Sequence, residues 1–190
     1  MFEHTAVLLS FVYALALTHL LSSVTDLVLA RERVRFSGLQ AAWMLIALVL
    51  VFVNWLEIWG LRAIAHWSLV DVTLLFLTAV TQYFTCSLVS VRVERGESVD
   101  MSAVFERQKP AFLAAFAAMV GLAMVLNYAE RDHSAGLSAT DWIGENLLIL
   151  PMAACVAISA FARARWLQWA SAIAMLASAL AALGLYTPLG

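Results

Sequence analysis

The chain has 190 residues, of which 64% are hydrophobic and 13% are charged, and its formal net charge is −2. Soluble domains carry about 25% charged residues, so this chain has too little polar surface to cover a globular core. The net charge also lacks the basic excess that nucleic-acid binding requires, so no nucleic-acid partner is expected. The composition predicts a single domain, residues 1–190, whose main partner is the lipid bilayer.

Six long apolar runs predict an all-α, polytopic membrane protein with six transmembrane helices and short loops. The runs cover residues 5–30, 39–60, 67–91, 111–128, 142–162 and 166–185. A helix of about 20 apolar residues crosses the hydrocarbon core. Backbone groups in hydrocarbon must pair within their own segment, and these runs do not alternate as the strands of a membrane barrel do.

Basic residues alternate between successive connections and so predict the orientation. The first, third and fifth connections hold nine of the eleven Lys and Arg residues. Loops rich in basic residues stay in the cytoplasm. The sequence therefore predicts a multi-pass protein of the cell inner (plasma) membrane, with both termini on the periplasmic or extracellular side.

The third connection, residues 92–110, is the longest and predicts a helix of its own. Ser98 to Asp100 can cap a short helix that ends near Gln108. One face of this segment is apolar and contains Met101, Val104 and Phe105. This pattern predicts a helix lying on the cytoplasmic membrane surface, with Pro110 then starting the fourth span.

The fifth run contains two further local signals. Ser138 and Asp141 have the spacing of a capping box at its entry. Pro151 lies inside the run and predicts a kink, because proline removes a backbone donor from a helix.

Polar residues of the first run share one helical face. These are His19, Ser22, Ser23 and Asp26, which lie within an arc of about 100°. Ionisable groups facing lipid are costly, so this face is expected to point into the bundle or a wet cavity. Two interpretations stay open: a proton or cation relay, in which His19 titrates near neutral pH, and a hydrogen-bonded packing network.

The third run carries a second polar face made of Asp71, Thr78, Gln82 and Thr85. One hypothesis is that this face lines a path for a solute or ion. The other is that it holds helices together, because hydroxyl and amide side chains commonly bond between membrane helices.

A third group lies around the second connection. Asn54 and Glu57 are one turn apart, and Glu57 and Asp71 are expected at similar depth. Two carboxylates this close repel each other, so one would be protonated or both would share a cation. A metal site that uses Glu57, His66 and Asp71 is a weaker alternative to interfacial polar residues in contact with water.

Several functions are disfavoured by what the chain lacks. Its one lysine, Lys109, lies in a loop, which excludes a retinal Schiff base inside the bundle. Only His19 lies deep in a run, which argues against a bis-His haem within one chain. Sequence motifs of nucleotide-binding proteins and hydrolases are missing, so an enzyme is not expected, although an intramembrane hydrolase stays open and the cofactor stays unspecified.

The start of the chain also carries a resemblance. The residues concerned are Leu17-Thr18-His19-Leu20-Leu21, Arg31-Glu32-Arg33-Val34-Arg35 and the Trp-rich end of the second run. This pattern resembles small bacterial membrane proteins of several helices. The resemblance implies a membrane protein and brings no assigned activity with it.

Two functional hypotheses follow from these features. The first is an ion channel or transport protein that binds or passes a small ion or solute, most simply a proton or cation, through a polar bundle interior as a homo-oligomer. The alternative is a non-catalytic accessory or assembly subunit that works with partner membrane subunits.

Overall fold

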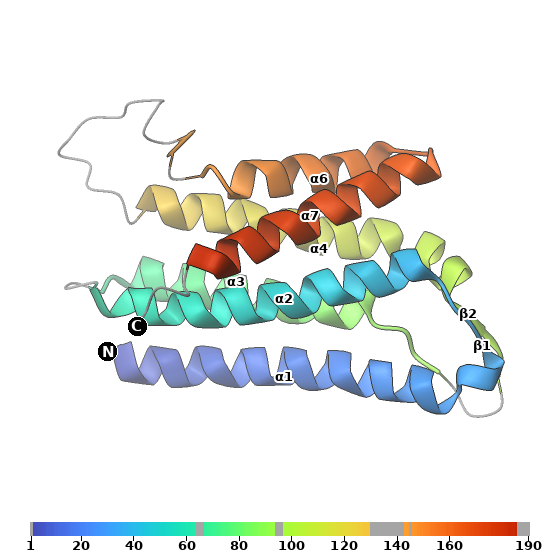
Figure 1. Cartoon of the computed structure of the whole chain (residues 1–190). Helices are drawn as coiled ribbons and strands as arrows, with labels where there is room; N and C mark the ends of the chain where they lie inside the picture. The colour runs from blue at the N-terminus through green and yellow to red at the C-terminus, as the bar shows by residue number, and fades with distance from the viewer. Residues whose placement is uncertain (1, 64–66, 94–96, 130–142, 145, 186–190) are drawn as a thin grey trace.

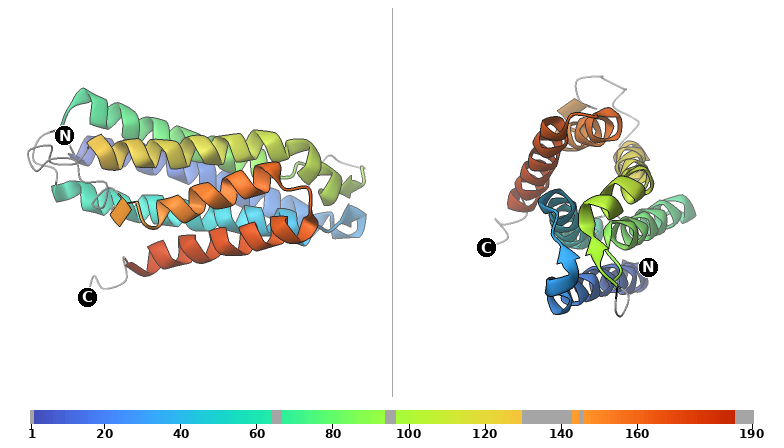
Figure 2. Two further views of the ribbon diagram at one scale, coloured as in Figure 1. Left: turned by 90° about the horizontal axis from the view of Figure 1, so that it is seen from above. Right: turned by 90° about the vertical axis from the view of Figure 1, so that its right-hand side faces the viewer.

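The computed structural model describes residues 2–63, 67–93, 97–129, 143–144 and 146–185, and nearly all of these are helical (Figures 1 and 2). The helices lie roughly along one direction and form a bundle. In this part of the chain the longer helices are α1 (Phe2–Leu29), α2 (Gly38–Gly60), α3 (Leu69–Val89), α4 (Met101–Ala129), α6 (Ile149–Phe161) and α7 (Arg165–Leu185). The short elements are η1 (Arg31–Arg33), β1 (Val34–Arg35), η2 (Leu61–Ala63) and β2 (Val99–Asp100).

Five of these helices are long and apolar enough to cross a membrane: α1, α2, α3, α4 and α7. The remaining one, α6, has 13 residues. At 1.5 Å per residue it is about 20 Å long, which is less than the roughly 30 Å of a hydrocarbon core. The predicted fifth span, 142–162, is thus represented by a shorter helix, and its expected capping residues Ser138 and Asp141 lie outside the described residues.

Pro151 lies near the start of α6, and a turn at residues 146–148 precedes it, so the expected kink within one continuous span is replaced by a helix start. This proline is the third residue of the helix. The first four N–H groups of a helix have no intrahelical acceptor, so proline costs no hydrogen bond there. The preceding turn is held by the Asn146 carbonyl, which accepts from the amides of Ile149 at 3.0 Å and Leu150 at 2.9 Å.

The fourth helix is one continuous element, which corrects two expectations. Residues 101–109 are its first turns rather than a separate surface helix, and Pro110 lies inside it. The reason is packing: Met101 and Phe105 are buried in the bundle, and the Phe105 ring lies 5.7 Å from the ring of Phe112. The predicted cap is confirmed, because Asp100 Oδ1 accepts from the amide of Ser102 at 2.8 Å.

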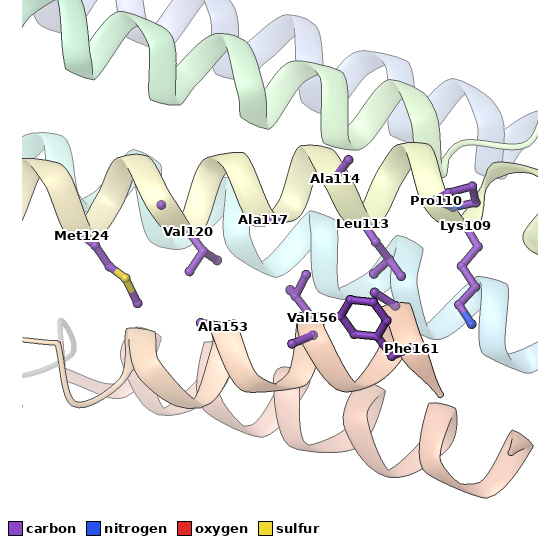
Figure 3. Close-up of a pocket in the computed structure, with 13 residues that line it drawn as sticks. Lys109, Pro110, Leu113, Ala114, Ala117, Val120, Met124, Ala153, Val156 and Phe161 are labelled. Carbon is purple, nitrogen blue, oxygen red and sulfur yellow. The ribbon is translucent and has the colours of Figure 1, made fainter. Parts of the chain in front are cut away.

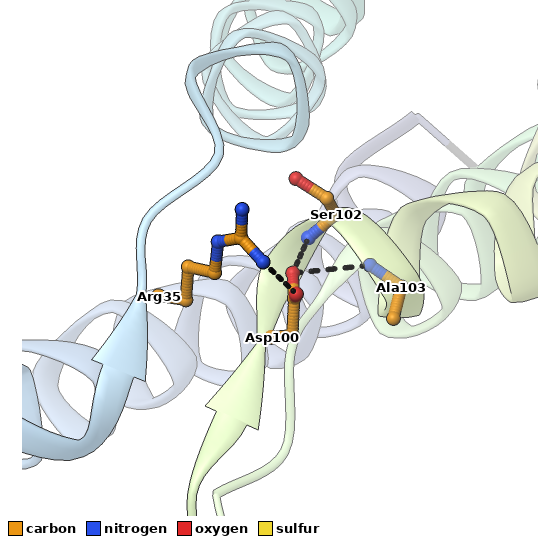
Figure 4. A network of polar contacts seen from close by, with 4 residues as sticks. All are labelled: Arg35, Asp100, Ser102 and Ala103. Atoms are coloured by element: carbon orange, nitrogen blue, oxygen red, sulfur yellow. Dashed lines mark hydrogen bonds and ion pairs between the residues drawn. The ribbon is translucent and has the colours of Figure 1, made fainter.

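A two-residue parallel sheet joins the first and third connections, and the sequence did not predict it. Val34 pairs with Val99, and Arg35 pairs with Asp100. The guanidinium of Arg35 lies 3.2 Å from the carboxylate of Asp100 (Figure 4). We call this end of the bundle, with η1, β1, β2, the start of α4 and the α6–α7 connection, the basic end. The first turn of α1 and the last turn of α7 lie at the opposite end (Figure 1).

The core is most aromatic towards the basic end, between α2 and α4. Trp43, Phe112 and Phe116 are each 0% exposed. The Trp43 ring lies 5.6 Å from that of Phe112 and 5.2 Å from that of Phe116. Around this cluster α3 packs against α1 and α4, while α7 packs against α2 and α6. Rings packed this closely fill the centre of the bundle.

Candidate functional site

A cavity of about 500 Å³ lies inside the bundle, in the half away from the basic end. All six of the longer helices contribute to its wall. Most lining side chains are apolar, and the exceptions are Tyr13, Asn54, Glu57, Thr78 and Asn127. Glu57 and Gly60 are exposed, which places the edge of the cavity at the surface of the bundle. We call this feature the bundle cavity.

Glu57 dominates the electrostatics of the bundle cavity. It projects from the last turns of α2, and it is the one acidic or basic residue among the described residues that line the cavity. Neither Lys nor Arg appears among the described residues that form the wall. Glu57 is exposed, so water screens part of its field and its influence is greatest at the edge of the cavity.

A hydrogen bond between α2 and α3 lies beside the bundle cavity. Asn54 Nδ2 donates to Gln82 Oε1 at 3.0 Å. Gln82 is 0% exposed, and its Nε2 donates to the Ala47 carbonyl at 3.3 Å. These contacts favour the interhelical interpretation of Gln82 over that of a path-lining residue.

The two threonines of the third-run face bond within their own helix. Thr78 Oγ1 donates to the Leu74 carbonyl at 2.9 Å, and Thr85 Oγ1 donates to the Thr81 carbonyl at 2.8 Å. Thr78 also lines the bundle cavity, whereas Thr85 is 0% exposed and does not line it. Four residues were predicted to share one polar face of α3: Asp71, Thr78, Gln82 and Thr85. Among them, Thr78 alone lines the bundle cavity.

Asp71 caps α3 instead of lining the bundle cavity. Its carboxylate accepts from the Ser68 amide at 2.9 Å, and its own amide donates to Ser68 Oγ at 3.1 Å. This is a complete capping box. The signal was available in the sequence, because Ser68 and Asp71 have the same spacing as Ser138 and Asp141.

The polar stripe of α1 divides between packing and exposure. Ser23 is buried and bonds to both backbone groups of Val91, donating at 2.8 Å and accepting at 2.9 Å. Gln40 of α2 donates to the Val89 carbonyl in the same region. Ser22 is exposed. The end of α3 is therefore held by polar side chains from both neighbouring helices.

His19 and Asp26 are not joined by a hydrogen bond in the described structure. They are seven residues apart on one helix, which corresponds to about 10 Å along its axis. His19 packs edge-on against Tyr83, with ring centroids 6.2 Å apart, and its buried Nδ1 has no hydrogen-bond partner. Asp26 is exposed near the end of α1. The relay between these two residues stays a prediction that would need an intervening group.

Metal binding is not tested for the whole predicted set. His66 lies outside the described residues. Among the residues that are described, no group of three His, Cys, Asp or Glu side chains is arranged to hold a metal ion. Asp71 is engaged in its capping box, and Glu57 lines the bundle cavity.

Two polar residues of the bundle cavity were missed at the level of sequence. Tyr13 of α1 lies on the buried face that also contains Leu9, Ala16 and Leu20, and this spacing could have indicated it. Asn127 near the end of α4 bonds to Asn146, Nδ2 to Oδ1 at 3.2 Å. No local signal in the sequence predicts the contact between Asn127 and Asn146.

Comparison of the chain with protein-family models, curated proteins and solved structures finds no match. The resemblance of residues 17–21 and 31–35 to small bacterial membrane proteins therefore gains no support from these comparisons.

Proposed function

We propose that the chain is an integral membrane protein that binds a small, positively charged organic solute in the bundle cavity. One observation carries the proposal: a cavity of about 500 Å³ has a mostly apolar wall, and among the described residues that line it Glu57 is the one acidic or basic side chain. Ligand sites in proteins typically measure about 300–1,000 Å³ and combine apolar walls with a few polar groups. A bare ion would need a shell of oxygen ligands instead of this apolar lining.

The wall chemistry defines the class of ligand. The Glu57 carboxylate would pair with an ammonium group near the edge of the cavity. Deeper in, Thr78 and Asn54 offer hydrogen bonds, while Leu50 and Met119 contact an apolar body. A primary or quaternary amine with an aliphatic or aromatic part meets all of these requirements.

The packed core between the cavity and the basic end supports binding over passage in this conformation. Gln82 and the rings of Trp43, Phe112 and Phe116 are all buried there. A solute that crosses the bundle would have to separate these contacts. Transport therefore requires a second conformation in which α2 moves relative to α3 and α4.

The distribution of basic residues supports an orientation for this site. With the basic end in the cytoplasm, the bundle cavity faces the periplasm or exterior. In that arrangement the start of α1 and the end of α7 lie outside, as expected for six crossings. The protein would then capture its ligand from the outer side of the inner membrane, alone or as a homo-oligomer.

Thermal unfolding of the purified protein with a series of organic cations tests the proposal. The probes are tetramethylammonium, tetraethylammonium, phenethylamine and the uncharged isostere of each. The cations that fit should stabilise the protein, by about 2.7 kcal/mol at 100 times the dissociation constant, and the isosteres should not. Glu57→Gln should abolish this effect, while Glu106→Gln, an exposed carboxylate at the basic end, should preserve it.

Two results would count against the proposal. The first is an absence of stabilisation by every cation in the series, and the second is stabilisation that persists in Glu57→Gln. Either result would make the accessory or assembly subunit the better account of this chain.

A further inference from the structure

A second hollow lies on the outside of the bundle and is separate from the bundle cavity. It is an apolar groove of about 600 Å³ between α4 and α6 (Figure 3). Small residues form its sides, with Ala114, Ala117 and Gly121 on one helix and Ala157 and Ala160 on the other. The groove is open because these side chains are too short to fill the space between the helices.

The groove continues into a polar hollow at the basic end. That hollow measures about 450 Å³ and is lined in part by Glu106, Lys109, Arg163 and Gln168. Lys109 and Phe161 border both hollows. Together they form one elongated site with an apolar body and a cationic head.

Contacts with the end of α6 position the cationic head. Lys109 Nζ donates to the Ala162 carbonyl at 3.3 Å, and Gln168 Nε2 donates to the same oxygen at 3.2 Å. These bonds hold the Lys109 ammonium at the junction of the two hollows. Arg163 adds a second positive charge and Glu106 one negative charge, so the head retains a net charge of +1.

Two indole rings mark the level of this head in the membrane. Trp166 and Trp169 follow directly along the chain and are 70% and 38% exposed. Tryptophan prefers the boundary between headgroups and hydrocarbon. The cationic hollow therefore lies at headgroup depth, and the groove extends from it into the hydrocarbon.

We propose that an anionic glycerophospholipid binds here, with its phosphate between Lys109 and Arg163 and an acyl chain in the groove between α4 and α6. The charge of the head selects an anionic lipid over a zwitterionic one. The apolar groove selects a lipid over free phosphate, because phosphate alone would leave the groove empty. This site is independent of the solute proposed for the bundle cavity.

Gly121→Leu is the most informative variant for the groove. A Cβ atom at Gly121 would meet no heavy atom within 4 Å, so the new side chain would enter open space. Replacing glycine within a helix also favours the helical state. The variant should therefore fold as well as the parent protein in lipid-free detergent while blocking the acyl chain.

The experiment measures lipid binding to the purified full chain by native mass spectrometry. The probes are phosphatidylglycerol and phosphatidylcholine with identical acyl chains, and inorganic phosphate. The parent protein should prefer phosphatidylglycerol. Arg163→Gln should weaken phosphatidylglycerol binding about fivefold, whereas Arg165→Gln, which removes an exposed charge outside both hollows, should leave it unchanged.

Each remaining outcome decides the proposal. Loss of phosphatidylglycerol binding in Gly121→Leu, with the unfolding temperature retained, supports it. Equal binding of the two lipids, or competition by inorganic phosphate at comparable concentration, overturns it. A change of oligomeric mass in Gly121→Leu with lipid preference intact would assign the groove to a second copy of the chain instead.

Discussion

Asn54 on α2, which lines the bundle cavity, donates a hydrogen bond of 3.0 Å to Gln82 on α3. Asn54 Nδ2 also approaches the sulfur of Met119 on α4 at 3.8 Å. The side-chain amide of Asn54 on α2 therefore contacts both α3 and α4. Because the amide of Gln82 is buried, loss of either partner affects both the packing and the depth of the cavity.

The first prediction concerns the strength of this contact. A double-mutant cycle with Asn54→Ala and Gln82→Ala should give a coupling energy of about 0.6–1.7 kcal/mol, the range measured for hydrogen bonds between membrane helices. Unfolding in mixed micelles provides the measurement. Strict additivity of the two substitutions would show that the bond does not join α2 to α3.

The second prediction concerns water in the bundle cavity. In a background of Cys86→Ala and Cys155→Ala, Thr78→Cys should react with a trimethylammonium thiosulfonate reagent, because it lines the cavity. Gln82→Cys, one turn further along α3, is buried outside the cavity and should not react. Leu77→Cys is the control, since Leu77 does not line this cavity. Equal labelling of Thr78→Cys and Gln82→Cys would indicate a continuous wet path along α3.

The third prediction separates the two carboxylates near the bundle cavity. Ser68→Ala should lower stability by about 1 kcal/mol, the usual cost of losing a helix cap, and Asp71→Ala should also destabilise α3. Neither variant should change the cation-dependent stabilisation that Glu57 provides. Chemical denaturation with and without tetraethylammonium measures both effects. Loss of the cation-dependent stabilisation in Asp71→Ala would show that Asp71 contributes to the cation site.

The fourth prediction concerns acid. Hydrogen bonds from the Ser102 amide, and then from that of Ala103, together with the charge of Arg35, lower the pKa of Asp100 (Figure 4). The ionised form therefore favours the folded state. Its contribution is complete above the unfolded pKa of about 3.9 and is lost as the pH falls through the lower folded value.

Parallel unfolding of the parent protein and Asp100→Asn between pH 7 and pH 2.5 checks this dependence. The stability difference between them should be constant down to about pH 4 and shrink below it. A difference that stays constant over the whole range would show that the charge of Asp100 plays no part.

The fifth prediction concerns orientation. Glu97→Cys lies at the basic end and Gly60→Cys at the opposite end, and both positions are exposed. An impermeant thiol reagent added to intact cells should label Gly60→Cys, because the basic end is expected in the cytoplasm. Labelling of Glu97→Cys from outside would invert the orientation and place the bundle cavity on the cytoplasmic side.

Helix positions were predictable where an apolar run ends at polar residues. The runs expected at 39–60, 67–91 and 166–185 correspond to α2, α3 and α7 within about two residues. The prediction that Pro110 starts the fourth helix was wrong, because a proline that fits the start of a helix is also tolerated inside one when the flanking turns are packed. Here Phe105 and Phe112 lie on either side of it and touch.

The site was harder to predict than the helices. Glu57 and Asn54 were indicated because polar groups inside apolar runs are costly. Whether such a group lines a cavity or caps a helix depends on which helices meet at its depth, and spacing within one run does not contain that information. Thr78 and Asp71 show both outcomes, since one lines the bundle cavity and the other closes a capping box.

The small parallel sheet has a consequence for the order of assembly during synthesis. Val34 can form its strand pair only after Val99, 65 residues later in the chain, has been synthesised. This strand partner emerges from the ribosome after α1, α2 and α3, and before most of α4. We therefore expect the β1–β2 pairing to hold the first three helices together at the basic end while the remaining helices are still being synthesised. A chain truncated after α4 should already protect this ladder from hydrogen exchange.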